Sequence, residues 1–262
     1  MSETVKRAIS GVIYIVLLVG ATVYSPLSFE ILFGIFMLIA SYEFAKLIKL
    51  PAFLCILLSL VASSAVFWNR DIFPIKIIAV FAVIILLALT AELFFTKEGN
   101  HSFLIKLGIF AGYILASFIT ILYLPFSESN YEPNIVISIF ILIWTNDTFA
   151  YIIGKKWGKN KLFERISPKK TIEGFAGGIL FCILASIILS LFFNFFSLGI
   201  WISSAIFVGI FGTIGDLIES KFKREANVKD SGNIMPGHGG ILDRLDSIIF
   251  VAPFLYIIFQ IL

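Results

Sequence analysis

The sequence predicts an all-α integral membrane protein, a polytopic bundle of about nine transmembrane helices with an N-in, C-out orientation. Three observations support this prediction. The mean hydropathy is +1.01. Of the 262 residues, 59% are hydrophobic and only 14% are charged, whereas soluble domains carry roughly 25% charged residues. Long apolar runs recur along the chain, and the basic residues gather between alternate runs. Composition therefore excludes an ordinary soluble domain.

Nine apolar runs approach the roughly 20 residues that a transmembrane helix needs. They lie near residues 8–24, 29–48, 52–68, 75–95, 103–124, 134–154, 175–195, 199–219 and 245–262. The first run follows Lys6 and Arg7 as a signal peptide would, but it lacks a clear small-residue cleavage site, so we expect a retained anchor. Because these runs leave no loop long enough for a soluble domain, residues 1–262 are expected to form a single membrane domain.

The positions of the basic residues predict the orientation of the bundle. If the first run begins in the cytoplasm, 18 of the 20 Lys and Arg residues fall in cytoplasmic segments. Arg70 and Lys76 fall on the other side, where the segment around Glu128 and Glu132 is acidic. Cytoplasmic segments of membrane proteins carry an excess of Lys and Arg. We therefore expect a multi-pass protein of a bacterial-type cytoplasmic membrane, with its charged segments facing the cytoplasm.

Several isolated polar residues interrupt or border the apolar runs. Cys55 and Cys182 lie inside runs and are expected to act as small buried hydrophobes, not as a disulfide or a metal pair. Glu30, Glu43 and Glu92 lie nearer the ends of runs. These acids are expected to be interfacial or paired with Lys.

The sixth run and the segment after it carry the first candidate site residues. Asn146 and Asp147 lie within the run, where an ionised Asp costs roughly 2.5–3.5 kcal/mol on insertion scales, so a functional role is the default interpretation. The basic stretch 155–161 follows. It is equally well explained as a membrane anchor that contacts anionic lipids and as part of a functional site.

A Ser-Pro-Lys-Lys-Thr stretch precedes the seventh run. Ser167 and Pro168 favour a helix that starts there, with Ser as the N-cap and Pro as the first helical residue. The free backbone N–H groups of such a helix, beside Lys169, Lys170 and Thr171, would form an anion site. Two lysines at that place suit a polyphosphate, whose charge must be offset during transfer.

Four acids border the second charged segment. Asp216 and Glu219 are three residues apart at the inner end of the eighth run, so they share one face of a helix. Asp243 and Asp246 repeat this spacing at the start of the ninth run. Mg²⁺ takes one or two carboxylate ligands and completes its shell with water and substrate phosphates. The alternative is a set of surface ion pairs, but these contribute only about 0–1 kcal/mol each. We therefore favour a Mg²⁺ site that could also hold a second cation.

A glycine-rich stretch, residues 236–240, lies between the two pairs of acids. Its flexible backbone can approach a phosphate closely. His238, within this stretch, could be a phosphate donor, a proton shuttle or a structural hydrogen-bonding residue, and the sequence leaves these roles open.

These motifs resemble the signature of the CDP-diacylglycerol synthase family, also called the phosphatidate cytidylyltransferases. The signature, Ser-x-x-Lys-Arg, Lys-Asp, Pro-Gly-His-Gly-Gly and Asp-Arg-x-Asp, is matched by Ser220, Lys223, Arg224, Lys229, Asp230, residues 236–240, Asp243, Arg244 and Asp246. Asp147 and residues 167–174 resemble a second conserved region of the family, so the motifs concentrate in residues 144–247. Phe149 departs from the family pattern, in which a small residue is expected.

The resemblance implies transfer of CMP from CTP to phosphatidic acid, which releases pyrophosphate and leaves CDP-diacylglycerol in the membrane. It implies Mg²⁺ as cofactor and CTP, phosphatidic acid and membrane lipids as partners, with no nucleic acid. Together with the motif chemistry it predicts catalytic roles for Asp216, Asp243, Lys223, Arg224, His238 and Asp246. The predicted metal ligands are Asp216, Glu219, Asp243 and Asp246. The predicted substrate-binding residues are Asp147, Ser167, Lys169, Lys170, Thr171, Glu173, Ser220, Lys229, Asp230, Gly239, Gly240 and Arg244.

Two other functions fit parts of the sequence. A CTP-dependent polyprenol or lipid kinase would use the same nucleotide and transfer its γ-phosphate, and the sequence alone does not reveal which phosphorus is attacked. An ion-coupled transporter would also place an acid such as Asp147 inside a span, but its polar residues would gather at the membrane midplane and not at one face. A homodimer is plausible and does not follow from the sequence.

Overall fold

The computed structural model of the chain describes residues 3–95, 101–127, 130–237 and 239–261. Helices dominate these residues, and their strands form two short antiparallel hairpins. The first helices are α1 (Glu3–Tyr24), α2 (Pro26–Ile48), α3 (Ala52–Trp68), the short η1 (Arg70–Ile72) and α4 (Ile75–Phe95). They are followed by α5 (Phe103–Ile109), η2 (Phe110–Ala116), α6 (Ser117–Tyr123), β1 (Phe126–Ser127), β2 (Asn130–Tyr131) and α7 (Pro133–Trp157). The chain continues with β3 (Lys161–Phe163), β4 (Ser167–Thr171), α8 (Ile172–Phe192), α9 (Leu198–Phe207), η3 (Val208–Gly212), α10 (Thr213–Glu225) and α11 (Leu242–Ile261).

Six helical segments of the described chain are long and apolar enough to cross a membrane. They are Pro26–Ile48, Ile75–Phe95, Phe103–Tyr123, Pro133–Trp157, Ile172–Phe192 and Leu198–Glu225. Two shorter apolar helices, Ala8–Tyr24 and Ala52–Trp68, lie at the first and third predicted runs, and α11 lies at the ninth. The prediction of an all-α membrane protein is confirmed. The number of nine crossings and the N-in, C-out orientation stay predictions.

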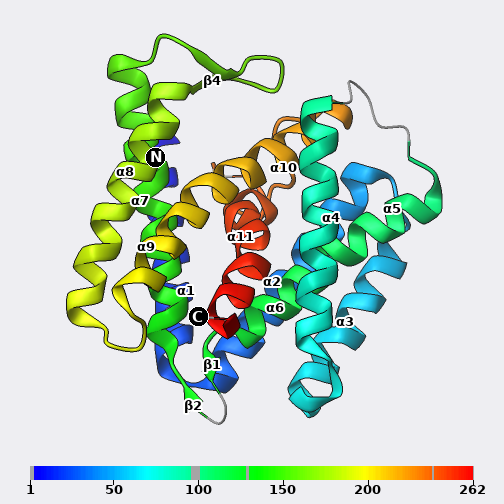
Figure 1. The fold of residues 1–262 in the computed structure, drawn as a ribbon. Coiled ribbons are helices and arrows are strands. Elements are labelled where there is room, and N and C mark those ends of the chain that lie inside the picture. The colour runs from blue at the N-terminus through cyan, green and yellow to red at the C-terminus, as the bar shows by residue number, and fades with distance from the viewer. Residues whose placement is uncertain (1–2, 96–100, 128–129, 238, 262) are drawn as a thin grey trace.

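Helix α11 lies at the centre of the bundle (Figure 1). It packs against α4, α6, α9 and α10. Four successive residues, Ile249, Phe250, Val251 and Ala252, have no exposed surface. A helix that is buried on every side belongs to a protein core, so α11 fixes the position of the helices around it.

Helices α7 and α8 form a closely packed antiparallel pair (Figure 1). Glycines on α8 allow this approach: a Cβ atom at Gly178 would lie 2.6 Å from Oδ1 of Asn146 on α7. Small residues at helix contacts let the backbones of membrane helices come close together. Cys182 of α8 is buried and free, and so is Cys55 of α3, as the sequence predicted.

The two basic segments lie at the same end of the bundle. The β3–β4 hairpin connects α7 to α8 at the upper end in Figure 1, whereas the β1–β2 hairpin lies at the lower end. Lys170 of β4 contacts Asp216 of α10, which joins the first basic segment to the second. Glu132 of the acidic segment lies beside β2 at the opposite end, and Glu128 lies outside the described residues. The basic and acidic segments are therefore separated along the axis of the bundle.

The predicted helix start at Ser167 is wrong. Ser167 and Pro168 begin strand β4, and α8 begins only at Ile172, with Thr171 as its N-cap. The backbone angle that Pro favours is also compatible with extended edge strands, and pairing with β3 holds this segment extended. The Thr171 hydroxyl accepts a hydrogen bond from a backbone N–H three residues later, which is the usual capping geometry. The two lysines of the segment consequently lie on the strand before the helix.

Candidate active site

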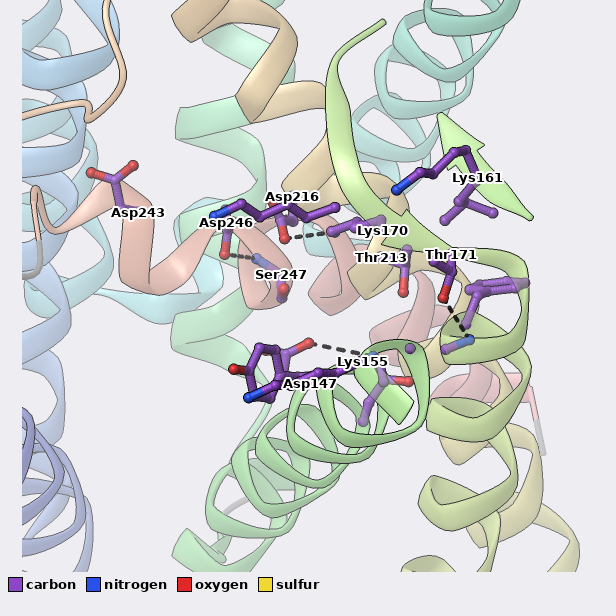
Figure 2. A pocket seen from close by; sticks show the side chains of 18 of the residues that line it. Asp147, Lys155, Lys161, Lys170, Thr171, Thr213, Asp216, Asp243, Asp246 and Ser247 are labelled. Atoms are coloured by element: carbon purple, nitrogen blue, oxygen red, sulfur yellow. Dashed lines mark hydrogen bonds and ion pairs between the residues drawn. The ribbon is translucent and has the colours of Figure 1, made fainter. Parts of the chain in front are cut away.

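A cavity of about 780 Å³ opens at the basic end of the bundle, between α7, the β3–β4 hairpin, α8, α10 and α11. Figure 2 shows how side chains from these elements converge on it. Ligand pockets commonly measure roughly 300–1,000 Å³, so the cavity is large enough for a nucleotide. It is lined by ten of the predicted site residues: Asp147, Lys169, Lys170, Thr171, Asp216, Lys223, Asp230, Asp243, Arg244 and Asp246.

Three carboxylates form a compact group at one side of the cavity. Asp216 and Glu219 come from α10 and Asp246 from α11, and their oxygen atoms lie within 4.8 Å of one another. The Glu219 side chain is 0% exposed, and among the described residues its oxygens contact only the Lys223 ammonium group. Mg²⁺ binds oxygens at about 2.0–2.1 Å, so a small inward shift of these groups would complete a set of protein ligands. The donor set fits a hard divalent cation.

Lys170 connects the hairpin to this carboxylate group. Its Nζ atom lies 2.6 Å from Oδ2 of Asp216, and the Ser220 hydroxyl donates a hydrogen bond of 3.2 Å to Oδ1 of the same carboxylate. The lysine predicted to bind phosphate is thus held beside a predicted metal ligand. Phosphate oxygens bound to a cation at this place would lie within reach of the ammonium group.

Lys223 lies between two acids. Its Nζ atom is 2.5 Å from Glu219 and 2.6 Å from Asp243, and the residue is only 8% exposed. Removing one partner of a buried ion pair typically costs about 3–5 kcal/mol, because the other charge remains buried and uncompensated. The position of Lys223 therefore depends on both acids, and it connects α10 to the start of α11.

Asp243 organises the segment between α10 and α11, residues 226–241, which contains the glycine-rich stretch and is called the glycine-rich loop. Besides the Lys223 contact at Oδ1, its Oδ2 atom accepts hydrogen bonds from Ser231 N at 2.9 Å, from Ser231 Oγ at 2.9 Å and from Gly240 N at 2.8 Å. Burial raises the pKa of this carboxyl, but Lys223 and the backbone N–H groups outweigh burial and hold the pKa below its ordinary value. Asp243 is therefore ionised and fully engaged, and it lies outside the three-carboxylate group.

The glycines of the loop are required by its backbone. Gly237 and Gly239 have φ angles of 78° and 87°, a region that residues with a side chain rarely adopt. A Cβ atom at Gly239 would also lie 2.6 Å from Oδ2 of Asp243. These glycines shape the loop around the Asp243 carboxylate. His238 lies outside the described residues.

Glu43 of α2 holds the same loop from the other side, a role that was not predicted from the sequence. Its carboxylate accepts hydrogen bonds from Ile241 N at 3.2 Å and from Leu242 N at 2.8 Å. The Ser231 hydroxyl lies between the Glu43 and Asp243 carboxylates, 3.2 Å from the first and 2.9 Å from the second. Glu43 was expected to be interfacial or paired with Lys. Among the described residues no lysine pairs with it, and the Lys46 ammonium group lies instead over the Tyr42 ring, 4.1 Å from its centre. The available signal was an acid within an apolar run, which by default indicates function.

The other two acids near span ends do form ion pairs. Glu92 of α4 lies 2.5 Å from Lys221 of α10, which confirms the expected pairing with a lysine. Glu30 pairs with Arg70, which is one of the two basic residues expected on the outer side. The expectation for Glu30 was an interfacial position or a lysine partner, and the partner in the structure is an arginine.

The stretch 155–161 contributes two lysines to the lining of the cavity. Lys155 and Lys161 line the cavity, and Figure 2 shows Lys161 on the side opposite Asp243. Lys156 has a different environment, with its ammonium group 4.6 Å from the centre of the Trp157 ring. The basic stretch is therefore divided between the site and an aromatic surface contact.

The remaining predicted residues lie around the cavity without lining it. Glu173 accepts hydrogen bonds from the backbone N–H groups of Lys159 and Asn160 and so closes the base of the hairpin. Arg224 donates to the carbonyl oxygen of Val228 just after α10 ends. Lys229 is exposed and lies beside a second, polar depression of about 690 Å³. In these positions Glu173 and Arg224 support the local backbone.

Fold and site together define a class of protein. The described chain is a helical membrane protein whose cavity, at one end of the bundle, combines basic side chains with a carboxylate group suited to a divalent cation. Phosphate-transfer sites combine charges in this way, because the cation and the basic groups offset charge on the phosphate oxygens. The chain belongs to the Cytidylyltransferase family, whose sequence model matches residues 5–262. The resemblance inferred from the motifs is confirmed.

One relative is similar over nearly the whole chain, and two others are similar over about half of it. The phosphatidate cytidylyltransferase of Bacillus subtilis (strain 168) is 36% identical over 266 aligned residues, which cover 98% of this chain and 97% of that protein. The protein of the same name from Staphylococcus haemolyticus (strain JCSC1435) is 55% identical over 121 residues, 45% of this chain and 46% of its own. That of Staphylococcus aureus (strain COL) is 47% identical over 145 residues, 54% of this chain and 55% of its own.

Proposed function

We propose that this protein is a phosphatidate cytidylyltransferase. It transfers CMP from CTP to phosphatidic acid, giving CDP-diacylglycerol and pyrophosphate in phospholipid biosynthesis. The observation that carries the proposal is the convergence of the family's motif residues, from α7, β4, α10, α11 and the loop before α11, around one cavity. The 36% identity to the Bacillus subtilis relative, which extends over 98% of this chain, supports it.

The chemistry that this site must perform is an exchange of phosphorus–oxygen bonds. A phosphate oxygen of the lipid attacks the α-phosphorus of CTP, the bond from that phosphorus to the oxygen bridging the β-phosphate breaks, and pyrophosphate leaves. Because the attacking group is already an anion, the site needs no strong base. Its main tasks are to bring two anions together in line and to offset their charge.

The charged residues divide these tasks between them. Asp216, Glu219 and Asp246 would hold a Mg²⁺ ion, which when bound offsets charge on the phosphate oxygens. Lys169, Lys170 and Arg244 are assigned to the phosphates because they line the same cavity.

For Asp243, Lys223 and Arg224 the contacts support positioning and not direct ligation. Both oxygens of Asp243 are engaged by Lys223 and by the loop. Arg224 donates to a backbone carbonyl group at the end of α10.

We infer the membrane placement from the separation of charge along the bundle. The predicted N-in orientation puts the cavity and both basic segments at the cytoplasmic face of a bacterial-type cytoplasmic membrane, where CTP is available. The lipid would reach the cavity from the inner leaflet. The whole chain would act as one membrane domain, and a dimer of such domains is compatible with this arrangement.

The test of the proposed function is the fate of each phosphorus atom of CTP. Purified protein in lipid nanodiscs is supplied with Mg²⁺, phosphatidic acid and CTP labelled at either the α- or the γ-phosphorus. We expect the α-label in a chloroform-soluble product and the γ-label in pyrophosphate. Appearance of the γ-label in lipid would instead identify a lipid kinase, and no labelled lipid from either substrate would refute both enzymes.

A variant pair connects this activity to the carboxylate group. Asp246→Asn keeps the size of the side chain and removes its charge, so we expect a loss of more than about tenfold, equivalent to about 1.4 kcal/mol in the barrier. Glu164→Gln is the control, because Glu164 is exposed at the hairpin turn and does not line the cavity. If both variants transfer CMP at the wild-type rate, the assignment of the metal site fails although the activity stands.

A further inference from the structure

A second, apolar cavity runs as a groove of about 370 Å³ along α1, beside the glycine-rich loop. Its floor consists of four buried side chains: Tyr14, Phe36, Met235 and Ile241. Its outer wall includes three exposed side chains of α1: Ile9, Ile13 and Leu17. A spacing of four residues puts these three on one face of the helix. The groove is therefore closed underneath and open along the side of an apolar helix, where a membrane protein meets lipid.

One end of the groove reaches toward the polar cavity through Tyr14. The Tyr14 ring lines the groove, and the residue is only 9% exposed. Its hydroxyl group is buried without a hydrogen-bond partner among the residues that the structure describes. Arg244 and Asp246, which line the polar cavity, are near enough to act on this hydroxyl electrostatically. A buried unpaired hydroxyl typically costs about 1–3 kcal/mol, so it indicates a place for an oxygen-bearing ligand.

The groove and the polar cavity share one chain segment. Ile241 lines the groove, and Asp243 and Arg244, two and three residues later, line the polar cavity. The Ser10 hydroxyl of α1 donates a hydrogen bond of 3.1 Å to the carbonyl oxygen of Pro236, which fastens the groove wall to the loop. Because of these contacts, the apolar groove has a defined position relative to the charged residues.

We propose that this groove binds one acyl chain of the phosphatidic acid substrate while its headgroup phosphate lies in the polar cavity. The inference rests on the proposed function and assigns the lipid end of that site. A phosphatidic acid molecule has this layout, since a phosphate, ester oxygens and an acyl chain follow one another. The Tyr14 hydroxyl lies where the polar and apolar parts meet, and it donates to an oxygen of the lipid there.

The groove contributes by orienting the lipid and not through the free energy of burying its acyl chain. An acyl chain in a bilayer is already in apolar surroundings, so moving it into an apolar groove gives little transfer free energy. What the groove provides is a fixed orientation of the lipid phosphate toward the nucleotide, which lowers the entropy cost of bringing the reactants together. Any lipid at the surface would touch the wall residues, but a phosphatidic acid also presents a phosphate without a headgroup alcohol, which the charged residues of the polar cavity can approach from more than one side.

Photolabelling of the wild-type protein tests occupancy of the groove. The probe is phosphatidic acid that carries a diazirine group within one acyl chain, and the labelled peptides are identified by mass spectrometry. We expect labelling around Ile13 and Met235 that excess phosphatidic acid suppresses and phosphatidylcholine with the same chains does not. Equal suppression by both lipids would mean ordinary surface lipid and would overturn the proposal, as would labelling confined to other helices.

Paired substitutions on α1 test whether the groove contributes to the transfer reaction. Ile13→Trp fills the groove, so we expect the KM for dioleoyl phosphatidic acid to rise by about fivefold, equivalent to about 1 kcal/mol. The KM for CTP and the rate with soluble dihexanoyl phosphatidic acid should not change. Val16→Trp is the matched control, because Val16 is 65% exposed on α1 and does not line the groove.

The results with Ile13→Trp and Val16→Trp test the acyl-chain groove separately from the proposed cytidylyltransferase activity. Equal losses with the long and the short substrate, or equal effects of the two substitutions, would refute the groove. Tyr14→Phe adds a test that removes the hydroxyl and keeps the ring, and it should raise the KM for both phosphatidic acids and not that for CTP. A wild-type protein that makes no CDP-diacylglycerol refutes the proposed function itself, whereas an active one without groove labelling refutes this inference alone.

Discussion

Replacing Glu43 by alanine tests whether the glycine-rich loop is held in place from α2. The wild-type carboxylate accepts hydrogen bonds from the backbone N–H groups of Ile241 and Leu242, at 3.2 and 2.8 Å. Glu43 is 2% exposed, so water cannot easily replace it. Each orphaned buried donor costs about 1–3 kcal/mol. The two donors together therefore destabilise the native loop by roughly 2–6 kcal/mol.

The expected consequence is a loss of activity larger than the loss of folded protein. A change of about 2.8 kcal/mol shifts an equilibrium by roughly a hundredfold, enough to displace the loop that positions Asp243 while the helices stay packed. Glu43→Gln retains one acceptor oxygen, so it should fall between the wild type and Glu43→Ala. The assay is the initial rate of label transfer from CTP to phosphatidic acid, together with the thermal unfolding midpoint in nanodiscs.

Glu132→Ala is the matched control for this experiment. Glu132 caps α7 at the opposite end of the molecule through the backbone N–H of Asn134, so its loss should reduce stability by about 0.5–2 kcal/mol. The rate of transfer by folded protein should not change. A Glu43→Ala protein with wild-type rate and stability would refute the reasoning, and so would an equal loss of activity in the control.

Three further predictions concern the cation, the lysines and the topology. Chelation of divalent cations by EDTA should abolish CMP transfer and added Mg²⁺ should restore it, whereas full activity in EDTA would exclude the metal site. Lys170→Gln, which removes the 2.6 Å contact with Asp216, should raise the KM for CTP at least about tenfold, or about 1.4 kcal/mol, and Lys156→Gln should leave it unchanged. Equal effects would indicate bulk charge and not a phosphate site. In a cysteine-free variant, single cysteines at Ser167 and Asn233 should react with an impermeant thiol reagent only from the cytoplasmic face, and reaction from outside would overturn the N-in orientation.

Much of the helical architecture could be predicted because it depends on local composition. Apolar runs of sufficient length must form helices in a bilayer, where every backbone group needs an internal partner. The spacing of Asp216 and Glu219 likewise predicted a shared helix face, which the three-carboxylate group confirms for these two residues and joins to Asp246. These features depend on a helical period and on segments whose boundaries the sequence marks.

The errors arose where tertiary contacts override local preference. Ser167 and Pro168 have good helix-start chemistry, yet pairing with β3 extends the chain until Thr171. Glu43 is separated by about 200 positions in sequence from the loop that it holds, so no local pattern could reveal its partners. The same applies to Lys155, whose place in the cavity depends on how α7 packs against α8.

The central position of α11 has a consequence for how the protein matures. Its N-terminal part supplies Asp246 to the carboxylate group, and its apolar residues fill the space between α4, α6 and α10. As the chain is synthesised, Asp216 and Glu219 of α10 emerge before α11, the helix that carries the third carboxylate of the group. Until α11 is inserted, the core lacks its central helix, and Asp216 and Glu219 lack the Asp246 carboxylate beside them. Insertion of this one helix therefore fills the core and brings the three carboxylates together in the same event.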